Sequence, residues 1–163
     1  MNKILILLLA AFTSGCFTQV PIDLQYSSPQ AGVPVATIRG SENKCVLLDN
    51  FTAFIAGIDG KLVMARRKGW NTPITIEAGH HILDVKFNRG VFVADTSFDF
   101  DAVADTNYQL KFTTDERLFG KNSYVDFWIV DMATSKTVSP IKEATVDGSR
   151  DDGGFFPLIF PAR

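Results

Sequence analysis

The chain has 163 residues, of which 46% are apolar and 21% are charged, and its formal net charge is -2 at pH 7. These proportions are ordinary for a globular protein and supply enough apolar material for one core. The nearly balanced charge argues against bulk nucleic-acid binding, which usually requires a strongly basic face.

The N-terminal segment has the pattern of a secretory signal. Lys3 precedes the apolar block 4–12, and the small residues Thr13, Ser14 and Gly15 lead to Cys16. A basic start, a short apolar block and small residues are typical of such signals. The block is about half as long as the roughly 20 apolar residues of a spanning helix. We therefore expect residues 1–15 to be a signal peptide rather than a membrane span.

The sequence Ser14-Gly15-Cys16 resembles the lipobox of bacterial lipoproteins, although Thr13 stands where that box usually has leucine. The resemblance implies an acylated Cys16 as the new N-terminus and a lipid anchor in the membrane. Phe17 rather than aspartate follows the cysteine, which in the family implies export to the outer membrane. The domain is then expected to face the periplasm, with the cell surface as the alternative. If an ordinary signal is cleaved nearby instead, Cys16 is a plain thiol.

Residues 16–33 are expected to be the acylated start and a flexible tether. They contain Pro21, Pro29 and several glutamine and serine residues without a sustained hydrophobic period. Such a stretch cannot bury enough apolar surface to offset its chain entropy. A short edge strand is the alternative here, because the apolar residues Ile22, Leu24 and Tyr26 alternate with polar ones.

From Pro34 onward the pattern is that of β-structure. Short strands are predicted at 35–39, 51–58, 61–65 and 72–77, and Asp59-Gly60 is a strong hairpin signal. Cys45, which lies between the first two, is expected to be a small buried hydrophobe, with a reactive thiol as the alternative.

The second half of the domain alternates more clearly. In 80–87 one face carries His81, Leu83, Val85 and Phe87, and in 91–102 one face carries Phe92, Ala94, Thr96, Phe98 and Phe100. Asn88-Arg89-Gly90 is the predicted turn between these strands, and further strands are expected at 108–112 and 124–130. Short alternating strands with such turns predict an all-β fold, an antiparallel β-sandwich of about seven or eight strands over residues 34–146.

The turn Asp59-Gly60 and the later turn Gly79-His80-His81, each joined to strands, resemble PEGA-type modules over about 51–112. The resemblance implies a small extracytoplasmic β-sandwich that binds or spaces other parts and does not catalyse. All of the matching residues belong to turns and strands, so no active site is implied.

His80 and His81 are the main candidates for chemistry. Adjacent residues of a strand point to opposite faces, so both cannot bind one metal ion on a regular strand. His80 and Asp84 share a face but lie about 13 Å apart along it, too far for two bonds near 2 Å. We expect a Gly-His turn whose imidazole bonds to nearby backbone, and no metal.

The acidic residues Asp95, Asp99, Asp101 and Asp105 lack the spacing of a calcium-binding loop and are expected to form a solvated face. The chain has no Gly-x-Ser-x-Gly elbow and no phosphate-binding glycine loop. We therefore expect no catalytic residue and no cofactor. The alternative is a small hydrolase or metal-binding protein that uses His80 or His81.

Two further segments are candidates for partner contact. Arg66, Arg67, Lys68 and Trp70 form a basic loop with an aromatic neighbour, which could contact a glycan, lipid headgroups or an acidic partner. The alternative is a solvated hairpin tip.

The C-terminal segment 147–163 is expected to be a flexible tail with an apolar end that contains Phe155, Phe156, Leu158 and Phe160. This end either folds back on the sandwich, which we favour, or docks on a partner. Together these features predict a non-catalytic envelope lipoprotein whose sandwich binds a protein or glycan partner or serves as a spacer.

Overall fold

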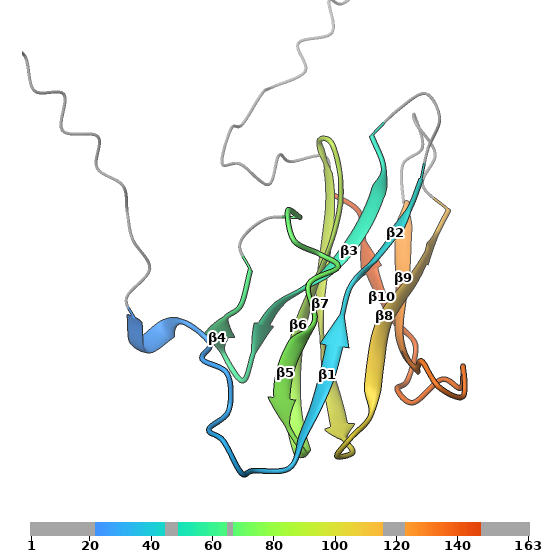
Figure 1. The fold of residues 1–163 in the computed structure, drawn as a ribbon. Coiled ribbons are helices and arrows are strands. Elements are labelled where there is room, and N and C mark those ends of the chain that lie inside the picture. The colour runs from blue at the N-terminus through green and yellow to red at the C-terminus, as the bar shows by residue number, and fades with distance from the viewer. Residues whose placement is uncertain (1–21, 45–48, 65–66, 116–122, 148–163) are drawn as a thin grey trace, which may run out of the picture.

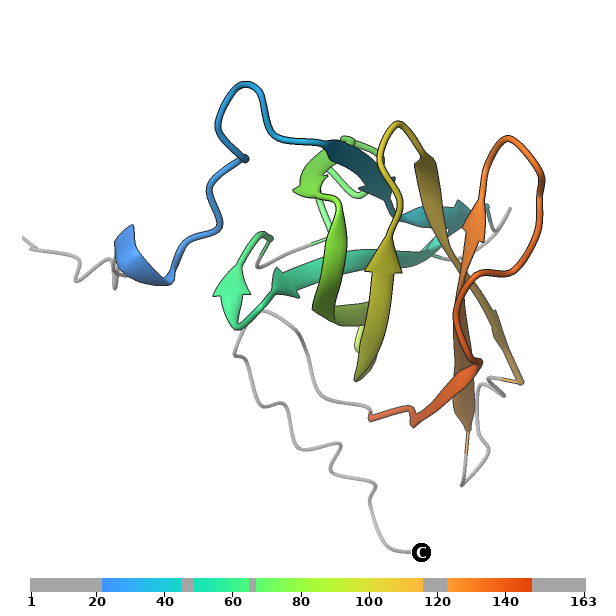
Figure 2. The ribbon, with the colours of Figure 1, turned by 90° about the horizontal axis from the view of Figure 1, so that it is seen from below.

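The computed structural model describes residues 22–44, 49–64, 67–115 and 123–147, which form two β-sheets packed face to face (Figure 1; Figure 2). The predicted all-β sandwich is confirmed. One sheet has the strand order β10-β9-β8-β1-β5, and the other has the order β2-β3-β6-β7 with β4 paired to β3. The elements are η1 (Ile22–Leu24), β1 (Val35–Arg39), β2 (Ser41–Asn43), β3 (Phe51–Ile58), β4 (Lys61–Leu62), β5 (Ile74–Glu77), β6 (Gly79–Arg89), β7 (Phe92–Ala102), β8 (Asn107–Thr114), β9 (Tyr124–Asp131) and β10 (Lys142–Thr145).

The strand pairing is antiparallel except between β1 and β8, which run parallel. β1 and β2 are separated only by Gly40 and belong to different sheets, so this stretch crosses from one layer to the other. The short strands β2 and β10, which the sequence pattern does not predict, raise the number in the described ranges above seven or eight. The strand predicted at 61–65 is present as β4, Lys61–Leu62. Both β2 and β4 pair with β3, β2 near its start and β4 at its end.

The hairpin of β6 and β7 is the longest regular pairing and runs from Gly79 opposite Ala102 to Arg89 opposite Phe92. The prediction that Asn88-Arg89-Gly90 form the turn is therefore wrong at its first two residues. Both of them are buried, and the Arg89 guanidinium lies 4.1 Å from the centre of the Phe51 ring. The strand continues to Arg89, which pairs with Phe92 of β7, and the turn lies at Gly90 and Val91.

The core lies between the sheets and is built mainly from phenylalanine and branched aliphatic side chains. The predicted inward faces are correct for Leu83, Val85 and Phe87 and for Phe98 and Phe100, all of which are buried. The largest fully buried side chains are Phe54, Phe87, Phe98, Phe100, Phe127, Ile38, Ile55, Ile58, Ile76, Leu83, Leu110 and Ile129.

The N-terminal segment contacts the sandwich at Gln25 and Tyr26, directly after η1. Ile22–Leu24 form a 3₁₀ turn rather than an edge strand, and Gln25 makes a bridge with Leu62 of β4. The Tyr26 side chain packs against the core, and its hydroxyl donates a hydrogen bond to the Thr75 carbonyl oxygen at 2.9 Å. Tyr26 therefore links the second sheet, through β4, to β5 of the first.

Several predicted features lie outside the described residues. They are the signal peptide 1–15, Cys16, Cys45, Arg66, and the tail residues Phe155, Phe156, Leu158 and Phe160. Among the described residues, no helix is long and apolar enough to cross a membrane.

Candidate functional site

A polar cleft with a volume of about 510 Å³ lies beside the first residues of β3. The side chains that line it come from β2, from the start of β3 and the residues before it, and from the loop after β4. They are Glu42, Asp49, Asn50, Thr52, Arg67, Lys68 and Trp70, together with Gly69. We call this site the Trp70 cleft.

The basic side of the cleft is held in place by backbone hydrogen bonds. Trp70 N donates to the Arg67 carbonyl oxygen at 3.2 Å, and Gly40 N donates to the Trp70 carbonyl oxygen at 2.8 Å. Gly40 has no room for a side chain, because an added Cβ would collide with the Ala53 carbonyl oxygen and lie 2.8 Å from that of Trp70. The close approach at Gly40 thus fixes the loop against β3.

The charged groups of the cleft are only loosely paired. The Arg67 guanidinium lies 3.7 Å from the Asp49 carboxylate, and the two side chains are 43% and 55% exposed. The Glu42 carboxylate accepts a hydrogen bond from the Thr52 hydroxyl at 3.4 Å. Exposed ion pairs of this kind contribute little to stability, so these groups can exchange their contacts for those of a ligand at small cost.

The structure thus brings together three of the four predicted contact residues, Arg67, Lys68 and Trp70. The sequence prediction missed the acidic side, Glu42 and Asp49. These two lie on either side of Cys45 in the chain, and nothing in their local pattern indicates that they face a loop more than 15 residues further on.

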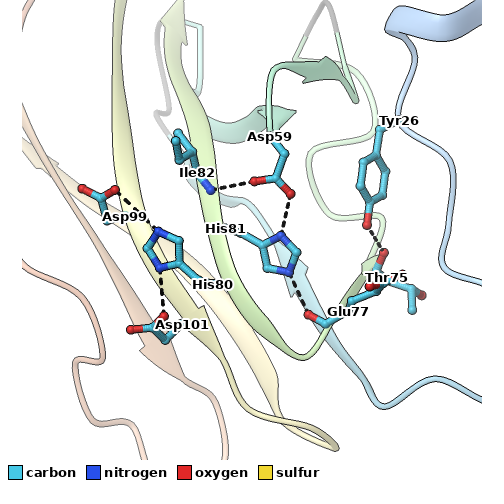
Figure 3. Close-up of polar contacts among 9 residues, drawn as sticks. All are labelled: Tyr26, Asp59, Thr75, Glu77, His80, His81, Ile82, Asp99 and Asp101. Carbon is cyan, nitrogen blue, oxygen red and sulfur yellow. Dashed lines mark hydrogen bonds and ion pairs between the residues drawn. The ribbon is translucent and has the colours of Figure 1, made fainter.

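The two adjacent histidines occupy opposite sides of β6, as the alternation predicts (Figure 3). His80 lies on the exposed side, where its Nδ1 is 2.9 Å from the Asp101 carboxylate and its Nε2 is 3.9 Å from that of Asp99. The His81 side chain is only 11% exposed and joins two turns of the chain. Its imidazole bonds to backbone, as predicted, but Gly79, His80 and His81 lie in β6 and do not form the predicted turn.

His81 is bound at both ring nitrogens (Figure 3). Its Nδ1 lies 2.7 Å from the Asp59 carboxylate and its Nε2 lies 2.9 Å from the Glu77 carbonyl oxygen. The other Asp59 oxygen accepts a hydrogen bond from Ile82 N at 2.8 Å. Both partners of the ring are acceptors, so both bonds form only when each nitrogen carries a proton. We call His81, Asp59 and Glu77 the His81 corner.

The pKa values in this corner shift as the hydrogen bonds require. Burial alone would lower the pKa of His81, but the bonds to Asp59 and to the Glu77 carbonyl outweigh it and raise the pKa. Burial alone would raise the pKa of Asp59, but the bonds from His81 and Ile82 lower it. The pair is therefore an imidazolium and a carboxylate over a wide range of pH.

These contacts suit His81 to a structural role rather than to proton transfer or metal binding. A doubly protonated imidazole has no free lone pair to accept a proton or bind a metal ion. Within the described ranges, no group of three or more histidine, cysteine, aspartate or glutamate side chains is placed to hold a metal ion.

Comparison with known proteins found no matching family model, no matching curated protein and no matching solved structure.

Proposed function

We propose that this chain is a lipid-anchored lipoprotein of a bacterial cell envelope whose β-sandwich is a non-catalytic binding module. The observation that carries the proposal is Ser14-Gly15-Cys16 directly after the apolar block 4–12. Acyl chains on Cys16 hold the protein in the bilayer, since two or more chains anchor firmly where one does not. Phe17 in place of aspartate supports an outer-membrane location on the periplasmic side.

The anchor is tested by replacing its cysteine. Cys16→Ser is expected to move the protein from the detergent phase to the aqueous phase in Triton X-114 partitioning, or to leave it unprocessed. Cys45→Ser is the matched control, because it removes the other thiol and is expected to partition like the wild type. Mass spectrometry of the mature N-terminus reads the acylation directly. A Cys16→Ser protein that stays with the detergent would contradict the proposal.

The contents of the Trp70 cleft support a glycan as the ligand of the module. Sugars present hydroxyl groups and an apolar face, and the cleft offers an indole, two cations and two carboxylates. Glu42 and Asp49 oppose the charge of Arg67 and Lys68, which disfavours a simple polyanion. The likeness to PEGA-type modules supports the same class of function, an extracytoplasmic binding or spacer domain.

Ligand binding is tested with the chain's two tryptophans. Trp70 lines the cleft, whereas Trp128 lies on β9 of the other sheet, opposite Lys111 of β8. Trp70→Ala is expected to abolish retention of the acylated protein on immobilised envelope polysaccharide, and Trp128→Ala is expected to retain it. Equal retention of the two variants would contradict the cleft as the binding site. A photocrosslinker at Lys68 that captures only protein would replace the glycan with a protein partner.

A further inference from the structure

Two exposed apolar side chains lie on η1, at one side of the sandwich. Ile22 is 87% exposed and Leu24 is 49% exposed, although each is followed closely by residues that pack on the domain. Figures 1 and 2 both place this turn on the opposite side from the loop between β9 and β10. Lys61 of β4, the strand that contacts η1, is exposed on the same side.

This turn is attached to the folded domain at several points. Gln25 bridges to Leu62, Tyr26 N donates to the Leu62 carbonyl oxygen at 2.9 Å, and the Tyr26 hydroxyl donates to the Thr75 carbonyl oxygen. The chain therefore joins the body of the sandwich at Gln25, directly after η1, and not at the end of the expected tether, residue 33. An anchor at Cys16 is therefore connected to the sandwich by a short segment of chain.

The length of that connection sets how far the domain can lie from an anchor. Five residues, 17–21, separate Cys16 from Ile22, and fully extended they span at most about 20 Å. A free tether that ran to residue 33 would span about 60 Å. The shorter connection brings the η1 side of the domain to the surface of the bilayer that holds the acyl chains.

We propose that Ile22, Leu24 and Lys61 form a membrane-docking edge that lies on the bilayer in which Cys16 is anchored. This inference rests on the acylation of Cys16 in the proposed function. Apolar side chains at an interface bury themselves at the boundary of headgroups and acyl chains, about 5–10 Å deep, and lysine favours anionic headgroups. The Trp70 cleft then faces away from the lipid, because β3, about 25 Å long, separates its lining residues from the turn at Lys61.

The docking edge is tested with a fluorescent probe at one site at a time. Single cysteines replace Ile22, Leu24, Lys61 or Ile141 in a Cys45→Ala background, where the acylated Cys16 does not react with a thiol label. Ile141 is the matched control, an isoleucine that is 65% exposed beside β10. The full acylated protein is placed in vesicles of phosphatidylethanolamine and phosphatidylglycerol with nitroxide quenchers in the headgroup or upper acyl chain.

We expect quenching at positions 22, 24 and 61 to be several-fold stronger than at position 141. The probe at position 61 decides the result, because position 22 lies near the lipid through its covalent connection alone. Equal quenching at 61 and 141, in protein that floats with the vesicles, would overturn the docking edge and leave the anchor intact. Protein that does not float and has an unmodified Cys16 would overturn the proposed function and the docking edge with it.

Discussion

The His81 corner and the Trp70 cleft are both polar surface features, but their polar groups are used differently. In the corner, the imidazole and the Asp59 carboxylate make three bonds of 2.7–2.9 Å to defined partners. In the cleft, the closest ion pair is 3.7 Å long and about half exposed. The close bonds of the corner suit it to holding the fold together, whereas the long, exposed ion pair of the cleft is consistent with the ligand binding that we propose.

The difference shows that two groups of residues that both stand out in the sequence make different kinds of contact in the fold. Adjacent histidines beside aspartates suggest a metal or catalytic site, yet His81 joins the β3–β4 turn to the start of β6. The basic loop at Arg67 to Trp70, with its aromatic residue, borders an open cleft instead. The two sites differ in how close their ionic contacts are, 2.7 Å between His81 and Asp59 but 3.7 Å between Arg67 and Asp49.

Substitution of Asp59 should have the largest effect on stability. Its backbone has φ 52°, and its carboxylate accepts bonds from His81 and Ile82. Asp59→Ala loses both bonds and places alanine in a left-handed conformation, so the free energy of unfolding should fall by about 2–3 kcal/mol. Urea denaturation followed by circular dichroism measures the loss.

Asp59→Asn separates the two contributions. Asparagine tolerates the left-handed conformation and can still accept the bond from Ile82 N, but it carries no charge to pair with the imidazolium. We expect it to lose about half as much stability as the alanine variant. Equal losses in the two variants would show that neither the turn conformation nor the bond from Ile82 N contributes and that the charge pair accounts for the whole effect.

The His81 corner should also make stability depend on pH. The raised pKa of His81 gives stability that is complete below its ordinary value, 6.5, and is lost as the pH rises through the folded value. The lowered pKa of Asp59 gives stability that is complete above its ordinary value, 3.8, and is lost as the pH falls through the folded value. The pair therefore stabilises the fold most between these two ordinary values.

The measurement is the difference in unfolding free energy between the wild type and His81→Gln across pH 3 to 9. Glutamine does not titrate at this site, and the subtraction removes the contributions of groups that both proteins share. The difference should be largest between pH 3.8 and 6.5 and should shrink by about 1 kcal/mol on each side. A difference that is constant with pH would mean that His81 and Asp59 have the same pKa values in the folded and unfolded states.

The strands were predictable because their alternation is a local property. Leu83, Val85 and Phe87 face the core at a spacing of two, and Asp59-Gly60 turns the chain where the sequence indicates. The end of β6 was not predictable, because Arg89 is buried beside Phe51 of β3, and a contact between residues so far apart in the sequence leaves no local pattern. The parallel pairing of β1 with β8 likewise depends on residues about 70 positions apart.

The candidate site was half predictable for the same reason. Arg67, Lys68 and Trp70 are close in sequence, and a basic loop with an aromatic residue is visible there. Glu42 and Asp49 meet that loop only because Gly40 brings the β1–β2 crossing against Trp70. The contacts of Tyr26 were not predictable either. A single tyrosine in a stretch rich in proline and serine does not indicate that it links the two sheets.

Substitutions in the cleft should have the smallest effect on stability and the clearest effect on binding. Arg67→Ala removes one partner of an exposed ion pair, so the free energy of unfolding should change by less than about 0.5 kcal/mol. If the cations of the cleft hold a glycan, the same variant should bind envelope polysaccharide at least tenfold more weakly, a change of about 1.4 kcal/mol.

Lys136→Ala, a substitution in the exposed turn between β9 and β10, is the matched loss of one positive charge away from the cleft and should leave binding unchanged. Loss of binding in both variants would show that net charge, and not the cleft, attracts the ligand. A large loss of stability in Arg67→Ala would show instead that the cleft resembles the His81 corner in holding the fold together.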